Sequence, residues 1–203
     1  APRHDQAPAG LDPGCSDCGQ AYVFRASDGL LQRTIANPLP ANGDLFGTSM
    51  VAMGSRVLIG APVIDAVTTS GGAAYLFDVA TGTLVQSFFN PAPTLNDEFG
   101  AALAAVGIDK VVIAARRDDV PTMLDTGVIY LFHVPTGAYL QTFTKAVPTS
   151  DDLFGTALAV WGSRIFVGTP LDDSVALDAG AVFSFVDSSC GNGTVDPGEA
   201  CDE

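Results

Sequence analysis

The sequence lacks any uninterrupted run of about 18 apolar residues, the length that a helix needs to cross a bilayer. We therefore expect no insertion into a membrane. Basic residues are also scarce, since 9 Lys and Arg stand against 23 Asp and Glu for a formal net charge of −14. This charge would repel nucleic acids and anionic lipids, so we expect neither as a partner.

Histidine, the commonest acid–base catalyst, occurs only twice. His4 lies in a stretch rich in Pro and Ala, and His133 occupies a repeat position that elsewhere holds Arg25, Asp78 and Val186. A position that accepts a cation, an anion and an aliphatic side chain is typical of a variable surface site. Because no nucleophile stands beside an orienting base, we predict that the chain is not an enzyme.

The cysteines are absent from the body of the chain and occur only near its ends, at Cys15, Cys18, Cys190 and Cys201. An even number in these places is typical of extracellular disulfides that fasten the termini. Three pairings are possible, and local bridges between Cys15 and Cys18 and between Cys190 and Cys201 are favoured. A redox or a zinc role would need a βαβ context or a second nearby cysteine pair.

The N-terminus shows no basic segment followed by an apolar stretch, so we expect that any signal peptide has been removed. Hydrophobic residues make up 47% of the chain and charged residues 16%, a composition that excludes a disordered polymer and indicates an ordered core.

A short pattern, Asp-x-Phe-Gly, occurs three times, at residues 44–47, 97–100 and 152–155. The Phe positions are 53 and then 55 residues apart. Repetition at this period is typical of stacked or radially arranged units, none of which buries its apolar face without a neighbour. Because Asp44, Asp97 and Asp152 recur in every copy, we interpret them as residues of a turn that each unit makes, not as catalytic acids.

A second column of aspartates follows, at Asp65, Asp118 and Asp173. In the first and third copies a glycine comes seven positions later, whereas in the second copy nine positions separate Asp118 from Gly127. We interpret this difference as a two-residue insertion in a tolerant loop.

Each repeat is predicted to form four short strands, which in the first copy are residues 49–53, 56–61, 73–79 and 84–89. The first strand is rich in small residues, as needed where sheets converge on an axis, and the second is an apolar run typical of a strand covered on both faces. The third carries large aromatics, and the fourth mixes in polar residues typical of an outer edge. We assign Trp161, at the end of a first strand, to core packing and not to sugar stacking.

The predicted class is therefore all-β, with four-stranded antiparallel blades. The chain opens with only a third and a fourth strand and ends with a first, second and third strand, which makes about three blades with incomplete terminal blades. A closed propeller typically needs four to eight. Either the chain is a piece of a longer one, or copies complete each other. We divide it into an N-terminal extension with a CxxC element (1–19), the blade repeats (20–187) and a cysteine-rich segment (188–203).

The Asp-x-Phe-Gly elements, with Gly60-Ala61-Pro62 and the Gly-Ala-Ala-Tyr-Leu-Phe stretch at 72–77, resemble the FG-GAP repeat, the blade unit of integrin-α-like β-propellers. The similarity covers roughly residues 20–187, although Gly-Ala-Pro degrades in the later copies. The stretch from Cys190 to Asp202 resembles a short cysteine-rich repeat of secreted and surface proteins of bacteria. These resemblances imply an extracellular recognition or structural module, secreted or at the cell surface and bacterial in origin.

Many propellers of that family bind calcium through an Asp-x-Asp-x-Asp-Gly loop, which is missing from this sequence. The corresponding stretches of the second and third copies hold Asp118, Asp119, Asp125, Asp172, Asp173 and Asp178. Three carboxylates in one loop could supply part of a calcium shell, because this cation prefers oxygen ligands. Alternatively, the short Asp side chains cap their own backbone in tight turns. No other cofactor is expected.

Two functions stay open. The first is a non-enzymatic structural or adhesion module that joins copies of itself, as a ring or a filament, or other surface proteins through unfinished blades. The second is a fragment of a larger secreted propeller protein that binds a glycan or a protein, or whose enzyme activity lies elsewhere. The unfinished strand count and the terminal cysteines favour the first.

Overall fold

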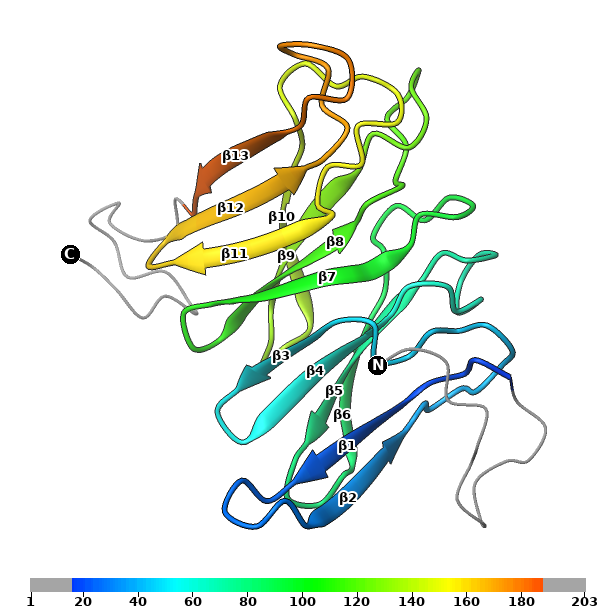
Figure 1. Ribbon diagram of the computed structural model, residues 1–203, viewed down its shortest axis with the longest axis vertical. Coiled ribbons are helices and arrows are strands. Elements are labelled where there is room, and N and C mark those ends of the chain that lie inside the picture. The colour runs from blue at the N-terminus through cyan, green and yellow to red at the C-terminus, as the bar shows by residue number, and fades with distance from the viewer. Residues whose placement is uncertain (1–15, 188–203) are drawn as a thin grey trace.

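The computed structural model describes residues 16–187, which form thirteen strands and no helix. Four antiparallel sheets follow one another along the longest axis of the molecule (Figure 1). Within the described residues, no helix is long and apolar enough to cross a membrane. The predicted all-β class, with blade-like sheets and incomplete first and last sheets, is confirmed.

The first sheet, the N-terminal hairpin, pairs β1 (Gln20–Phe24) with β2 (Leu31–Ala36). Blade A consists of β3 (Met50–Met53), β4 (Arg56–Ala61), β5 (Ala73–Asp78) and β6 (Leu84–Phe88). Blade B consists of β7 (Phe99–Val106), β8 (Lys110–Ala115), β9 (Val128–His133) and β10 (Ala138–Phe143). Blade C consists of β11 (Ala157–Trp161), β12 (Arg164–Thr169) and β13 (Ala181–Val186). Strands pair in chain order within every sheet.

The sheets pack face to face, so three apolar layers fill the spaces between them. The first lies between the N-terminal hairpin and blade A, the second between blades A and B, and the third between blades B and C. Blade B is covered on both faces, and every residue of β8 is buried. In β12 buried residues alternate with half-buried or exposed ones, and in β13 half-buried residues alternate with exposed ones, so the prediction of a second strand covered on both faces is wrong for blade C.

The Asp-x-Phe-Gly element forms the contact between successive sheets. Its Phe is fully buried and packs on two aromatic residues of the third strand in its own blade. Phe99, for example, lies 6.0 Å from both Tyr130 and Phe132, measured between ring centroids. Gly100 has a φ of +93°, and a Cβ there would lie 2.4 Å from the carbonyl oxygen of Ala73 in blade A. Only glycine fits, because the backbone is left-handed and the two blades approach closely.

The extra residues of the second repeat are divided between two turns. Between β7 and β8, Val106 pairs with Lys110 and leaves three residues in the turn, whereas Met53 pairs with Arg56 in blade A and leaves two. The loop between β8 and β9 holds the other extra residue. The prediction of a two-residue insertion at one place is therefore wrong.

Candidate functional site

The loops that carry the predicted calcium ligands join the second and third strands of each blade. One backbone hydrogen bond closes each loop, from Gly72 to Ile64, from Gly127 to Asp118 and from Gly180 to Asp172. Ile64 and Asp172 are thus the structural equivalents of Asp118, and the equivalents of Asp65 are Asp119 and Asp173. The aspartate column read from the sequence was displaced by one residue in the second copy, because the turn before β8 is longer there.

In blades B and C the second aspartate of the loop caps its own backbone. A side-chain oxygen of Asp119 accepts the N–H of Asp125 at 2.9 Å, and Asp173 accepts the N–H of Asp178 at 2.7 Å. Asp125 and Asp178 both have a φ of +52°, so the loop turns sharply at these residues. The Asp125 carboxylate also pairs with Arg117 at 3.1 Å. These contacts match the capping role that the sequence offered as the alternative to calcium.

The first aspartate of the loop points inward in blade B. Asp118 is 2% exposed, and its Oδ2 accepts the hydroxyl of Tyr130 at 2.6 Å and the amide of Asn90 at 2.9 Å. The same amide donates to Asp97 at 2.8 Å, so Asn90 links two buried carboxyl groups. Burial is the main cause that raises the pKa of Asp118 to about 6, and the nearby Asp97 adds to it. We call Asn90, Asp97, Asp118 and Tyr130 the blade B cluster.

Blade C places an ammonium group where blade B has the amide. Lys145 Nζ lies 3.0 Å from Asp152 and 2.5 Å from Asp172, and all three side chains are buried. Burial alone would raise the pKa of Asp172, but hydrogen bonds from Lys145 and Ser174 lower it to about 2. The ring of Phe183, which replaces the tyrosine of blade B, lies 6.0 Å from the ammonium. Lys145, Asp152, Asp172 and Phe183 form the blade C cluster.

The equivalent cluster in blade A is the least polar of the three. Asp44 accepts the Asn37 amide at 2.7 Å and the N–H of Ala41 at 2.6 Å, but Ile64 stands where the other blades have a second carboxyl group. Burial raises the pKa of Asp44. The hydroxyl of Tyr75 is buried without a hydrogen-bond partner among residues 16–187, and burial raises its pKa to about 12. We call Asn37, Asp44, Ile64 and Tyr75 the blade A cluster.

The six aspartates predicted as calcium ligands do not converge. Asp118 and Asp172 lie in buried clusters, Asp119 and Asp173 cap their loops, and Asp125 and Asp178 supply the capped N–H groups. No group of three or more His, Cys, Asp or Glu side chains suited to a metal ion occurs in the part of the chain that the structure describes. The calcium site stays a prediction that this geometry does not support.

Sequence reasoning missed Asn90 and Lys145, the side chains that hold the buried carboxyl groups. Both stand seven residues before the Asp of Asp-x-Phe-Gly, as does Asn37 in the first copy. A polar residue at that fixed distance was the available signal. The sequence assigned His133 to the surface. Its Nε2 lies 3.5 Å from a carboxylate oxygen of Asp109, and its Nδ1 shares a hydrogen bond of 2.8 Å with the hydroxyl of Thr136.

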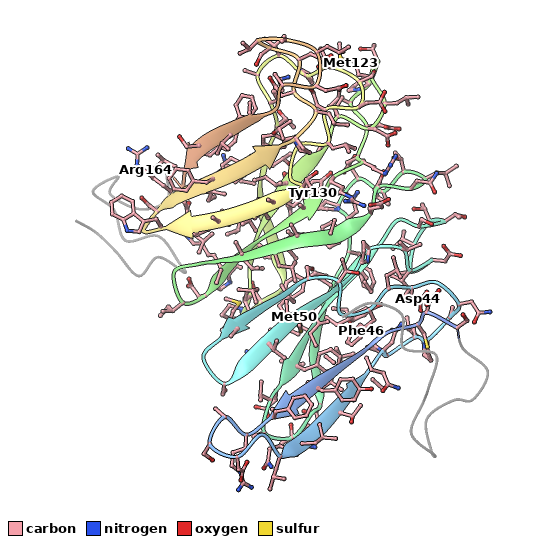
Figure 2. All side chains as sticks on the ribbon, viewed as in Figure 1. Asp44, Phe46, Met50, Met123, Tyr130 and Arg164 are labelled. Carbon is pink, nitrogen blue, oxygen red and sulfur yellow. The ribbon has the colours of Figure 1, made fainter. Side chains whose placement is uncertain are left out.

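An open cleft of about 680 Å³ lies beside the blade B cluster. The cleft is lined by residues 91, 92 and 94, by the loop 118–124 and by the side chains of Tyr130 and Tyr139. In Figure 2, Tyr130 lies among the sheets and Met123, also part of the lining, lies on an outer loop. The lining is mostly apolar and includes the two phenol rings and the carboxyl groups of Asp118 and Asp119.

No sheet of the described residues covers the outer face of blade C. This face carries Trp161, Val182 and Val186, which are 77%, 71% and 49% exposed, and neighbouring small residues of β11. Figure 2 shows Arg164, from the same face, projecting away from the sheets. The assignment of Trp161 to the core is wrong, because no sheet of residues 16–187 packs on this side, whereas its equivalent Val106 is buried between blades B and C.

The opposite end of the array also exposes apolar side chains. Phe24 and Leu31, which pair across the N-terminal hairpin, are 57% and 52% exposed. The ring of Tyr22 lies 6.3 Å from that of Phe24. Tyr22 and Phe24 correspond in register to Tyr75 and Phe77 of blade A, which are buried beneath Phe46.

Cys18 takes part in a disulfide. Cys15, Cys190 and Cys201 lie outside the described residues, so the predicted pairing stays a prediction, as do the boundaries at 1–19 and 188–203. No protein-family model matches the chain, and no curated protein matches it. The resemblance to FG-GAP repeats therefore also stays a prediction.

Proposed function

We propose that the protein is a non-enzymatic extracellular structural or adhesion module that associates through its outer blade faces with copies of itself or with another surface protein. One observation carries this proposal: every internal sheet face is buried against a neighbour, whereas the two outer faces of the same construction are exposed. Exposed apolar sheet faces of this kind are typical of interaction surfaces.

Two further features agree with an extracellular place. The disulfide at Cys18 is of a kind that persists in oxidising compartments. The net charge of −14 keeps a chain with exposed apolar faces in solution until a specific partner binds.

Solution mass, electron microscopy and binding of the labelled chain to bacterial cells test this function together. We expect assemblies whose mass rises with concentration, or binding to cells that an excess of unlabelled chain displaces. A stable monomer that binds no cell surface would contradict the proposal.

The cleft beside Tyr139 favours a second candidate, a module that binds a glycan or a protein segment. Tyr139 is 47% exposed and offers a ring on which a sugar or an apolar side chain can stack. A panel of immobilised glycans tests this candidate, with Tyr139→Ala expected to lose binding and Ile108→Ala, at an exposed residue outside the cleft, as the control. Equal binding by both variants would place any ligand elsewhere.

A further inference from the structure

The outer face of blade C has the same design as the internal face that blade B presents to blade C. By strand register, Ala157, Phe166 and Val182 occupy the places of Ala102, Val112 and Ile129. In blade B these three are buried under Phe154, Ile165 and Val167. The internal contact therefore shows which kind of surface fits the outer face of blade C: a sheet face of aromatic and aliphatic side chains.

The glycine column gives independent support for a missing cover. A Cβ on Gly72 would lie 2.2 Å from the backbone oxygen of Phe99 in the next blade, and a Cβ on Gly127 would lie 2.1 Å from that of Phe154. Gly180 keeps the same left-handed backbone, with a φ of +72°, but its nearest neighbour is Pro170 of its own blade. Within residues 16–187, blade C thus retains the close-approach glycine without a segment from another sheet that approaches it.

The outer face of the N-terminal hairpin exposes side chains of the complementary kind. In blades A, B and C the aromatic pair of the third strand faces the preceding sheet, as Tyr130 and Phe132 face blade A. Tyr22 and Phe24 form the same pair, in which Tyr22 is half-buried. Phe24 and the neighbouring Leu31 are 57% and 52% exposed, and no sheet of residues 16–187 lies in front of them. One chain therefore exposes both halves of the contact that it uses three times internally.

We propose that the outer face of blade C binds the Tyr22–Phe24 face of the N-terminal hairpin of a second copy of this chain, head to tail. This inference rests on the proposed function and names the surfaces and the partner. Such a contact is heterologous, so it produces a ring when the rotation closes and a filament when it does not.

The contact is weaker than the internal ones. At the junction of blades B and C, backbone N–H groups of Asp151, Leu153 and Phe154 donate to carbonyls of residues 124–126. The hairpin has two strands and no Asp-x-Phe-Gly segment, so it brings apolar contact without these hydrogen bonds. A small interface of this type gives a dissociation constant of roughly micromolar to millimolar. The fraction of associated chains therefore depends on the protein concentration.

Sedimentation of three exposed-site variants tests the proposal. Val182→Glu blocks the blade C face, Phe24→Glu blocks the hairpin face, and Ile108→Glu, at a residue 82% exposed in the turn between β7 and β8, is the matched control. We expect the wild type and the control to associate alike, and each blocking variant alone to associate at least about tenfold more weakly. Unchanged melting temperatures show that all three fold.

Mixing the two blocking variants separates this contact from others. Each retains the half that the other has lost, so an equimolar mixture should form a complex that stops at two chains. Association that Val182→Glu abolishes and Phe24→Glu leaves intact would overturn the head-to-tail contact while the proposed function stands. A monomer that still binds cells has the same meaning, whereas a monomer without any binding contradicts both.

Discussion

The clusters of blades B and C occupy the same place in the repeat but balance buried charge differently. In blade B an amide and a tyrosine hold two carboxyl groups, and the pKa of Asp118 rises to about 6. In blade C an ammonium lies between the two carboxylates, and the pKa of Asp172 falls to about 2. The same backbone thus accepts either a neutral or an ionic set of partners, provided that each buried carboxyl group has a partner.

Lys145→Met is the change with the largest expected effect on this comparison. It leaves Asp152 and Asp172 buried without their cation, which should lower the free energy of unfolding by about 3–5 kcal/mol at pH 7. Urea unfolding measures the loss. The double variant Lys145→Asn with Asp172→Ile copies Asn37 and Ile64 of blade A and should recover most of it. An equal loss in both would show that the ion pair is not the cause.

The pH dependence of stability should differ in sign between the two clusters. Because the folded-state pKa of Asp118 lies above its ordinary value of 3.8, its contribution is largest below pH 4 and is lost as the pH rises through 6, by about 3 kcal/mol. For Asp172 the lowered pKa adds stability above pH 4 that is lost as the pH falls towards 2. Asp118→Asn should remove the loss between pH 4 and 7. If the stability of this variant depended on pH in the same way as that of the wild type, the raised pKa of Asp118 would be contradicted.

Two tyrosine variants separate a satisfied hydroxyl from an unsatisfied one. Tyr130→Phe removes the donor to Asp118 and should lower the free energy of unfolding by about 1–3 kcal/mol. Tyr75→Phe removes a buried hydroxyl that has no partner among the described residues, so it should be neutral or slightly stabilising. Paired denaturation curves measure both. A similar loss in the two variants would mean that the ring environment, and not the hydrogen bond, sets the effect.

Of the changes considered, the addition or removal of calcium should have the smallest effect on stability. Because the predicted ligands cap their loops or lie in the buried clusters, we expect the melting temperature to stay the same when calcium or EDTA is added. A rise with calcium that Asp119→Asn and Asp173→Asn abolish would restore the predicted site in these loops. Asp28→Asn, at the tip of the N-terminal hairpin, is the control.

The sequence predicted the strands well because their signals are local: apolar runs such as Val111–Ile113, and glycines that turn the chain. The burial of single side chains was harder to predict, since it depends on residues that are far away in the sequence. Asp118 looked like one more loop aspartate, and only the packing of Asn90 and Tyr130 around it shows otherwise. Trp161 has the character of a core residue, but it is exposed because no sheet of the described residues lies beside it.

The packing of blade B between two other sheets affects the order in which the parts of the molecule unfold. Each sheet contacts only its neighbours, so the N-terminal hairpin and blade C can detach while the rest stays folded. Amide protons in β8 and β9 should then exchange with solvent last, and those at the two extremities first. Association of chains end to end would slow exchange at the extremities, and each chain would gain rigidity where alone it is loosest.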